Sequence, residues 1–350
     1  MNPHEDPVRA VASMLEGGPF LWFPTGPRPT TLDATVGAVV QTSGSTGTGK
    51  RVVLSREALI AASRASRASL GADLTWHLVL PHHYVAGLMV VVRSLVGERA
   101  PITASPDLSD LRPTGGGDAI SIVATQLHRA LESPDAIRAL ARFDVVLVGG
   151  AALAPELRGR AVAAGVPLKE TYGMSETCGG VVWDGHPLPG ATVQILPDSL
   201  APPGAGRIAL GGSTLCDGYL NDAGTLEGAA TRDGLLVTAD WGRMEDSLLW
   251  VGGRLDDVVI SGGINVDLGA VRRAVEALDA EATVVGVEDP EWGTRIVVFA
   301  TDGTLLDWRD RLAPALSRTA LPRQFVRVSA LPRTPGGKPD RQALLALAAR

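Results

Sequence analysis

The sequence lacks several features that mark out particular classes of protein. Among its 350 residues there are only two cysteines and only 4% aromatic residues, and acidic residues outnumber basic ones. Neither Cys178 nor Cys216 stands in the spacing of a metal site, and both are expected to be small buried side chains, as in a cytosolic protein. The net charge of −6 at pH 7 argues against a nucleic-acid-binding surface.

Signals for export and for membrane insertion are also missing. The N-terminal segment MNPHEDPVRAVASMLEGGPF has no basic start and no long apolar run, so we expect no secretory signal. No window reaches the roughly 18 uninterrupted apolar residues of a membrane span, because Arg93 interrupts the most apolar segment, PHHYVAGLMVVVRSLVGE. We therefore expect a cytoplasmic protein, and its length favours one large domain plus a smaller one.

Strand-like and helix-like segments alternate through the first half of the chain. HLVLP, SIVA and FDVVLVGGA are predicted to be buried strands, and TQLHRALES and APELRGRAVAAG to be helices, which indicates an α/β fold with a mainly parallel, helix-covered sheet. Short strands and turns over about residues 191–255 predict an antiparallel β subdomain, and helices are expected over Leu268–Leu278 and near Trp308–Ser317. We expect a large N-terminal domain over residues 1–255, with mixed or parallel sheets, and a small, mobile α+β domain over residues 256–350.

A glycine-rich loop stands between two strand-like segments near the N-terminus. TSGSTGTGKR, residues 42–51, has the Gly44-x4-Gly49-Lys50 spacing of a Walker A loop, but Arg51 stands where that motif needs a Ser or Thr hydroxyl for magnesium. A Walker loop also opens directly into a helix, whereas RVVLS after this loop is predicted to be extended. We therefore expect a different phosphate loop, in which hydroxyls, backbone N–H groups and a lysine surround the anion.

Five segments, read in order, resemble the adenylate-forming superfamily of acyl- and aryl-CoA synthetases, adenylation domains and luciferases. TSGSTGTGK is similar to the phosphate loop of that family, ETYGMSET to its YGxTE motif and TADWG to its ribose-binding segment. GRLDDVVISGGINV is similar to the hinge motif, and PRTPGGKPDR to the C-terminal lysine motif. The resemblance covers the chain from about residue 40 to its end. It implies that a carboxylate and ATP give acyl-AMP and pyrophosphate, after which a thiol gives a thioester and AMP.

The resemblance implies a role for each residue of the nucleotide site. Glu176 is expected to bind Mg2+, because a hard cation that bridges phosphates prefers carboxylate oxygens. Asp240 is expected to accept hydrogen bonds from both ribose hydroxyls, and Tyr172 to stack on the adenine. The expected ATP-binding residues are Thr42, Ser43, Gly44, Ser45, Thr46, Gly47, Lys50, Gly149, Gly150, Ala151, Thr171, Tyr172, Gly173, Met174, Ser175, Asp240 and Arg254. The family often has proline where Gly49 stands, and this departure is expected to loosen the loop.

A lysine and a hinge near the C-terminus are implied to serve the two half-reactions. Lys338, in a turn-rich loop, is expected to bridge the attacking carboxylate and the α-phosphate during adenylation, which stabilises the charge of the transition state. It is then expected to leave as the small domain rotates about Asp256. Gly262 and Gly263 are expected to approach the thiol, although on local sequence alone they are equally a tight turn.

The early position of the glycine loop is similar to that in the compact bacterial o-succinylbenzoate–CoA ligases of menaquinone biosynthesis. LPHHYVAGLMVVVRSL and IVATQLHRAL also resemble that group, and they imply that His83, Tyr84 and Gly87 line the acyl pocket or thiol tunnel and that Gln126 faces the substrate. On the residues alone, the histidines are equally a surface turn and Gln126 a helix-capping residue. The resemblance implies ATP, Mg2+ and coenzyme A as ligands and o-succinylbenzoate as the acid.

Several alternatives stay open on the sequence. The chain could act on another aryl or short acyl acid, or load the thiol of a separate carrier protein. A non-catalytic nucleotide-binding protein of the same fold is disfavoured because Lys338, Glu176 and Asp240 are all present. A Walker-type hydrolase is the least supported of the four. The oligomeric state is open, and a homodimer is the general expectation.

Overall fold

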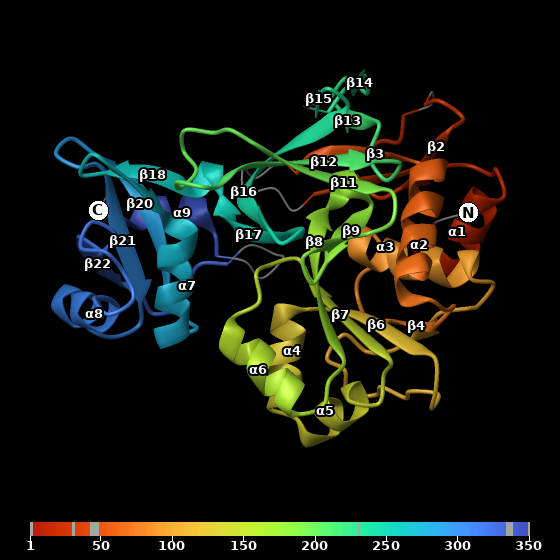
Figure 1. Ribbon diagram of the computed structural model, residues 1–350, viewed down its shortest axis with the longest axis horizontal. Helices are drawn as coiled ribbons and strands as arrows, with labels where there is room; N and C mark the ends of the chain where they lie inside the picture. The colour runs from red at the N-terminus through yellow and green to blue at the C-terminus, as the bar shows by residue number, and fades with distance from the viewer. Residues whose placement is uncertain (1–2, 30–31, 43–48, 230, 334–338, 349–350) are drawn as a thin grey trace. The chain divides into compact units, whose positions relative to one another are not determined.

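The computed structural model describes residues 3–29, 32–42, 49–229, 231–333 and 339–348 of the chain (Figure 1). The chain divides into two compact units. Unit 1 comprises Met1–Gln194, Ala209–Val237 and Met244–Leu249, and unit 2 comprises Ile195–Ile208, Thr238–Arg243 and Trp250–Arg350.

The glycine loop of unit 1 joins two paired strands. The strands of the first sheet are, in spatial order, β1 (Leu21–Trp22), β2 (Val36–Gln41), β3 (Arg51–Ser55), β13 (Gly218–Leu220) and β14 (Leu226–Glu227). β2 and β3 are antiparallel, with Gln41 opposite Arg51, so the loop connects neighbouring strands. Helix α2 begins only at Arg56, where the Ser55 hydroxyl caps it by accepting from the Ala58 N–H. The predicted strand–loop–strand order is therefore confirmed, and it differs from the strand–loop–helix order of a Walker site.

A seven-stranded sheet forms the centre of unit 1. Its strands are, in spatial order, β10 (His186–Pro187), β9 (Gly179–Trp183), β8 (Leu168–Met174), β7 (Val145–Gly149), β6 (Asp118–Val123), β4 (Thr75–Leu78) and β5 (Ile102–Thr103). The neighbours from β8 to β5 pair in parallel, whereas β8–β9 and β9–β10 are antiparallel. The expected mainly parallel sheet is confirmed, with antiparallel strands at one edge.

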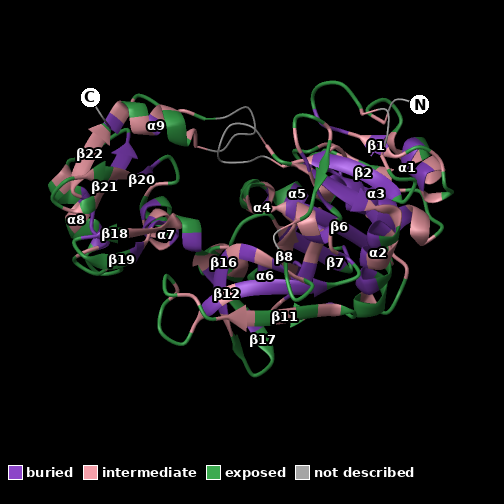
Figure 2. Ribbon diagram, turned by 90° about the horizontal axis from the view of Figure 1, so that it is seen from above, coloured by how far each residue is buried: buried purple, intermediate pink, exposed green. Residues whose placement is uncertain are grey.

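Helices cover both faces of this sheet. One face is covered by α3 (Val85–Val96) and the other by α4 (Ala124–Leu131), α5 (Pro134–Leu140) and α6 (Pro155–Ala163), while α1 (Pro7–Leu15) and α2 (Arg56–Leu70) pack against α3 and the first sheet. On strands β6 and β7, Ala119, Val145 and Leu147 pack into the core that contains α3. The apolar residues that alternate with them along these strands pack into the core that contains α4. Successive side chains of a strand point to opposite faces, so β6 and β7 are almost wholly buried (Figure 2). Burial on both faces explains why the sequences of these two strands are mainly apolar.

A third sheet contains most of the expected β subdomain. Its strands are β11 (Ala191–Leu196), β12 (Gly206–Gly212), β16 (Leu235–Glu245) and β15 (Thr231–Arg232), and β17 (Leu248–Arg254) pairs with β16. Strands β13 and β14, which lie between β12 and β16 in the chain, instead belong to the first sheet.

Unit 2 contains a further sheet flanked by helices. Its strands are, in spatial order, β19 (Ile264–Asp267), β18 (Val258–Ser261), β21 (Gly293–Ala300) and β20 (Thr283–Asp289), with β22 (Gln324–Arg327) paired to β21. Helix α7 spans Leu268–Leu278, as predicted. The helix expected near Trp308–Ser317 was placed too late, because α8 spans Leu305–Leu312. Helix α9, Arg341–Ala348, was not expected.

The start of α8 is fixed by a reciprocal cap. The Thr304 hydroxyl accepts from the Asp307 N–H, and an Asp307 carboxylate oxygen accepts from the Thr304 N–H.

No helix in the described part of the chain combines the length and apolarity that crossing a membrane requires.

Candidate active site

The two ends of the glycine loop are joined by hydrogen bonds. The Thr42 N–H donates to the Lys50 carbonyl at 2.9 Å, and the Lys50 N–H donates to the Thr42 hydroxyl at 3.0 Å. The Gln41 amide nitrogen also donates to the Gly49 carbonyl at 3.4 Å. The expected phosphate ligands within the loop lie outside the described residues: Ser43, Gly44, Ser45, Thr46 and Gly47. The structure therefore places the base of the predicted phosphate loop and its lysine.

Gly49 is the residue that lets these two ends approach. A Cβ atom at this position would lie 1.8 Å from the Thr42 carbonyl oxygen. Contacts that close are not found in real structures, so any side chain at residue 49 must move the strand ends apart. Glycine at residue 49 thus permits the close approach of the two loop ends, and the expected loosening of the loop stays a prediction.

Replacing Gly49 by alanine is expected to weaken ATP binding by at least about tenfold, because a shift of about 1 Å in a positioning loop has large effects. Isothermal titration with ATP would measure the loss. The matched control is Gly159→Ala in helix α6, where the added Cβ meets nothing within 4 Å. Equal ATP affinity in Gly49→Ala and wild type would show that the loop does not need its observed closure.

Glu176 lies in a short turn that a buried threonine fixes. The Thr177 hydroxyl, 0% exposed, accepts from the Met174 N–H at 2.9 Å and donates to the Gly179 carbonyl at 2.7 Å. Cys178 follows with φ +52°, and the Cys216 N–H donates to the Glu176 carbonyl at 2.8 Å. Hydrogen bonds thus hold the backbone on both sides of Glu176. They fix the point from which its half-buried carboxylate extends.

Tyr219 contacts both Glu176 and Lys50. Its hydroxyl donates to Glu176 Oε1 at 2.9 Å, and Lys50 Nζ lies 4.8 Å from the centroid of its ring. Burial and the nearby Glu176 carboxylate raise the pKa of Tyr219, so the hydroxyl keeps its proton and acts as the donor. Sequence reasoning missed Tyr219, because nothing local in GYL distinguishes it from a half-buried strand tyrosine.

The donors around Glu176 fit a magnesium ion that arrives with a nucleotide. In the described part of the chain, no group of three or more His, Cys, Asp or Glu side chains is arranged to hold a metal. Mg2+ in nucleotide enzymes is held by one or two carboxylates together with phosphate oxygens and water. A single oriented carboxylate beside the phosphate loop is therefore the donor set that such an ion needs from the protein.

The expected adenine wall comes from neighbouring strand ends. A Cβ atom at Gly149 would lie 2.4 Å from the Thr171 hydroxyl oxygen, so the end of β7 and the middle of β8 are in close contact. Gly150 has φ +82°, and a Cβ at Gly173 would lie 2.1 Å from the Gly179 carbonyl oxygen. Ligands of open α/β sheets bind at the carboxyl ends of parallel strands. The segments Gly149–Ala151 and Thr171–Ser175 therefore meet where such a ligand would bind.

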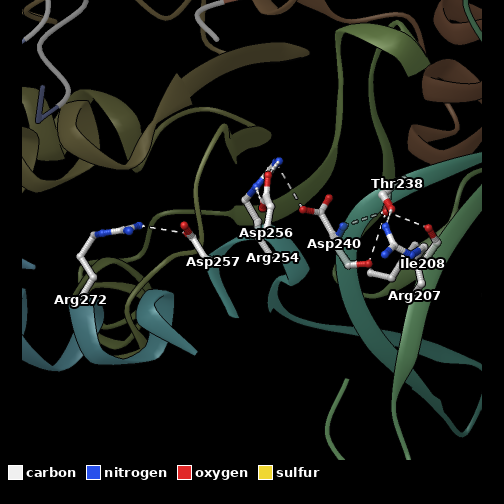
Figure 3. A network of polar contacts seen from close by, with 8 residues as sticks. All are labelled: Arg207, Ile208, Thr238, Asp240, Arg254, Asp256, Asp257 and Arg272. Atoms are coloured by element: carbon white, nitrogen blue, oxygen red, sulfur yellow. Dashed lines mark hydrogen bonds and ion pairs between the residues drawn. The ribbon is translucent and has the colours of Figure 1, made fainter. Parts of the chain in front are cut away.

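Asp240, in unit 2, is a nearly buried carboxylate beside an arginine (Figure 3). It is 9% exposed, its N–H donates to the Thr238 hydroxyl at 3.1 Å, and one of its oxygens lies 3.6 Å from Arg254 Nη1. Thr238 in turn donates to the Ile208 carbonyl at 2.7 Å and its carbonyl accepts from Arg207 at 2.9 Å. These hydrogen bonds fix the backbone of Asp240, the residue that is predicted to bind the ribose.

Arg254 is bound chiefly by Asp256. Its Nε and Nη2 atoms donate to the two Asp256 oxygens at 2.8 and 2.6 Å. The two side chains lie next to each other in Figure 3. These bonds raise the pKa of Arg254, and they lower the pKa of Asp256 against the opposing effect of burial. The predicted nucleotide-binding arginine and the predicted hinge residue therefore form one bidentate pair.

Gly262 and Gly263 form the turn between β18 and β19, with φ +61° and +77°. The Gly262 N–H donates to the Trp292 carbonyl at 2.9 Å, and a Cβ there would lie 3.2 Å from the Trp292 ring. The tight-turn interpretation is thus confirmed, while the approach to a thiol stays a prediction. Lys338 lies outside the described residues.

The predicted acyl-pocket residues lie at the start of α3 and α4. The ring centroids of His83 and Tyr84 are 4.4 Å apart. A Cβ atom at Gly87 would lie 2.3 Å from the Pro81 carbonyl oxygen. Gln126 accepts from the Val123 N–H at 3.0 Å and donates to the Pro106 carbonyl at 2.8 Å. Gln126 therefore caps α4, and its contact with a substrate stays a prediction.

Two family models match the chain. A model described as AMP-binding enzyme matches residues 9–220, and one described as AMP-binding enzyme C-terminal domain matches residues 279–338. A probable 2-succinylbenzoate-CoA ligase of Mycobacterium tuberculosis (strain CDC 1551 / Oshkosh) is 37% identical over 334 residues, which are 90% of this chain and 85% of that protein. The 2-succinylbenzoate-CoA ligase of Enterococcus faecalis (strain ATCC 700802 / V583) is 30% identical over 89% of this chain and 69% of that protein.

Solved structures with the same fold carry nucleotide-like ligands. The o-succinylbenzoate coenzyme A synthetase (MenE) of Bacillus subtilis in complex with ATP and magnesium ion matches with a TM-score of 0.77 and 23% identity, over 97% of this chain and 81% of that one. Wild-type E. coli MenE with a bound analogue of OSB-AMS matches with a TM-score of 0.67 and 27% identity, over 93% of this chain and 72% of that one. The first likeness, at its low identity, establishes the fold alone.

Proposed function

Because the chain belongs to the family of AMP-binding enzymes, we propose that it is an ATP-dependent acid–CoA ligase whose acid is o-succinylbenzoate. The observation that carries the proposal is the group formed by Lys50, Tyr219 and Glu176, which sets a cation and a carboxylate of the kind that Mg2+ prefers beside the joined ends of the glycine loop. The identity of the acid rests on the relatives, two of which are named for 2-succinylbenzoate and align along most of this chain.

In the first half-reaction a carboxylate oxygen of the acid attacks the α-phosphorus of ATP, and pyrophosphate leaves. Two anions must approach, so the site has to offset negative charge. Lys50 and the loop N–H groups bind the β- and γ-phosphates, and Glu176 holds Mg2+, which when bound offsets phosphate charge. Asp240 accepts hydrogen bonds from the ribose, and Tyr172 packs on the adenine. Lys338 stabilises the charge that develops on the α-phosphate.

In the second half-reaction the thiol of coenzyme A attacks the acyl carbon, and AMP leaves. We propose that residues 256–350 act as a small domain that turns about Asp256 between the two steps, as lids do in many enzymes. Lys338 then leaves, and the turn at Gly262 and Gly263 approaches the pantetheine. Arg254 has to exchange Asp256 for the nucleotide when it serves as a ligand.

A product analysis tests the proposal. The protein is incubated with ATP, Mg2+, coenzyme A and a panel of carboxylic acids that includes o-succinylbenzoate, and AMP, pyrophosphate and thioester are followed by mass spectrometry. We expect AMP, pyrophosphate and the o-succinylbenzoyl thioester, and without coenzyme A only the acyl-AMP and pyrophosphate. ADP and phosphate would exclude adenylation, AMP with other acids only would exclude the named substrate, and acyl transfer only to a carrier protein would exclude coenzyme A.

A further inference from the structure

Tyr219 stands between two groups of opposite charge that need different partners. Its hydroxyl donates to Glu176 Oε1 at 2.9 Å, and its ring lies 4.8 Å from Lys50 Nζ. In a site that binds ATP with Mg2+, the lysine must bind phosphate and the carboxylate must bind the metal. A direct ion pair between them would occupy both before the nucleotide arrives.

The strand that carries Tyr219 is fixed on both sides of it. β13 pairs antiparallel with β3, with Tyr219 opposite Val52 and Leu220 opposite Arg51. Arg51 Nη1 also lies 3.5 Å from the Asn221 carbonyl oxygen. Upstream, the Cys216 N–H donates to the Glu176 carbonyl at 2.8 Å. The backbone that carries the Tyr219 ring and the backbone that carries Glu176 are therefore both held by hydrogen bonds. The strand that leaves the phosphate loop sets the position of Tyr219.

We propose that Tyr219 is a positioning residue of the metal–phosphate site: its hydroxyl orients the Glu176 carboxylate for Mg2+, and its ring keeps Lys50 from pairing with that carboxylate. This inference rests on the proposed function. The hydroxyl holds Oε1 and so restricts the orientation of the Glu176 carboxylate. The other carboxylate oxygen is then positioned to bind a cation. The face of the ring attracts the ammonium group of Lys50, but it leaves the N–H donors of that group for phosphate.

Two substitutions separate the hydroxyl from the ring. In Tyr219→Phe the ring stays and the hydrogen bond is lost. The Mn2+ concentration that half-saturates the complex of enzyme with α,β-methylene-ATP, measured by electron paramagnetic resonance, is expected to rise about three- to tenfold. Binding of the same analogue without metal, measured by isothermal titration, is expected to stay as in wild type. In Tyr219→Leu the metal-free affinity is also expected to fall, because Lys50 can then pair with Glu176.

Asn221→Ala, directly after the strand that carries Tyr219, is the matched control. The Asn221 side chain donates to Glu227 Oε1 at 2.8 Å and accepts from the Thr225 N–H, so its loss loosens the β13–β14 hairpin without touching Glu176. We expect wild-type Mn2+ dependence in this variant. An equal shift in Asn221→Ala and Tyr219→Phe would overturn the proposal, because strand packing would then be the cause.

The outcomes also distinguish this inference from the proposed function. If the wild-type protein binds metal and nucleotide and forms acyl-AMP, but Tyr219→Phe keeps its metal dependence, then only the role of Tyr219 is wrong. If the wild-type protein shows no metal-dependent nucleotide binding, both the function and the role of Tyr219 are wrong. Thermal unfolding of each variant shows whether a lost effect is lost folding.

Discussion

Replacing Lys338 by alanine is expected to slow acyl-AMP formation by about 10²–10³-fold, which is the usual cost of removing one charge-stabilising donor from a transition state. The attack of coenzyme A on supplied acyl-AMP should proceed close to the wild-type rate, because the lysine is proposed to act only in the first half-reaction. Pyrophosphate release in a single turnover measures the first step, and thioester formation from synthetic acyl-AMP measures the second.

The chain offers a close control for this experiment, because it contains only three lysines, Lys50, Lys169 and Lys338. Lys169 lies on β8 with its Nζ atom 3.8 Å from an Asp184 oxygen, and it is half-exposed. Lys169→Ala should leave both half-reactions near wild type. Equal losses of both steps in Lys338→Ala would contradict a mechanism with two conformations.

Local sequence signals predicted the elements whose causes are local. The extended segment after the glycine loop and the helix Leu268–Leu278 were correctly predicted, since strand propensity and capping act over a few residues. Helix α8 begins earlier than predicted, because the Thr304 cap starts it at Leu305. The cap pattern Thr-x-x-Asp was present in the sequence and could have given the correct start.

The parts of the site that depend on tertiary contacts could not be predicted in the same way. Tyr219 reaches Glu176 because β13 pairs with β3, a strand more than 160 residues earlier in the chain, as well as with its neighbour β14. Motif resemblance gave Arg254 and Asp256 separate roles, but it did not predict their bidentate pair. The requirement for glycine at residue 49 likewise follows from the approach of Thr42 across the loop.

Replacing Glu176 by glutamine is expected to lower the rate of acyl-AMP formation by about 100-fold or more at a fixed Mg2+ concentration, because losses of even outer metal contacts reach that range. Glutamine keeps the shape of the side chain, and its amide oxygen can still accept from the Tyr219 hydroxyl. The change therefore removes the negative charge and little else. Raising the Mg2+ concentration should restore part of the rate, and metal-free binding of ATP should not weaken.

The control for Glu176→Gln is Glu170→Gln on the preceding strand β8. Glu170 is a partly buried carboxylate whose pKa is raised by burial, and its Oε1 lies 3.2 Å from Arg158 Nη1. Its loss removes the same charge from the strand that leads into the Glu176 turn without removing the proposed metal ligand. The rate of acyl-AMP formation could fall equally in both variants, with no recovery in either at a higher Mg2+ concentration. The cause would then be a general change in the charge of the sheet edge. If only Glu176→Gln responds, the carboxylate beside Tyr219 is the one that binds the metal, and Arg51 is not a defective magnesium ligand but part of the strand that positions the tyrosine.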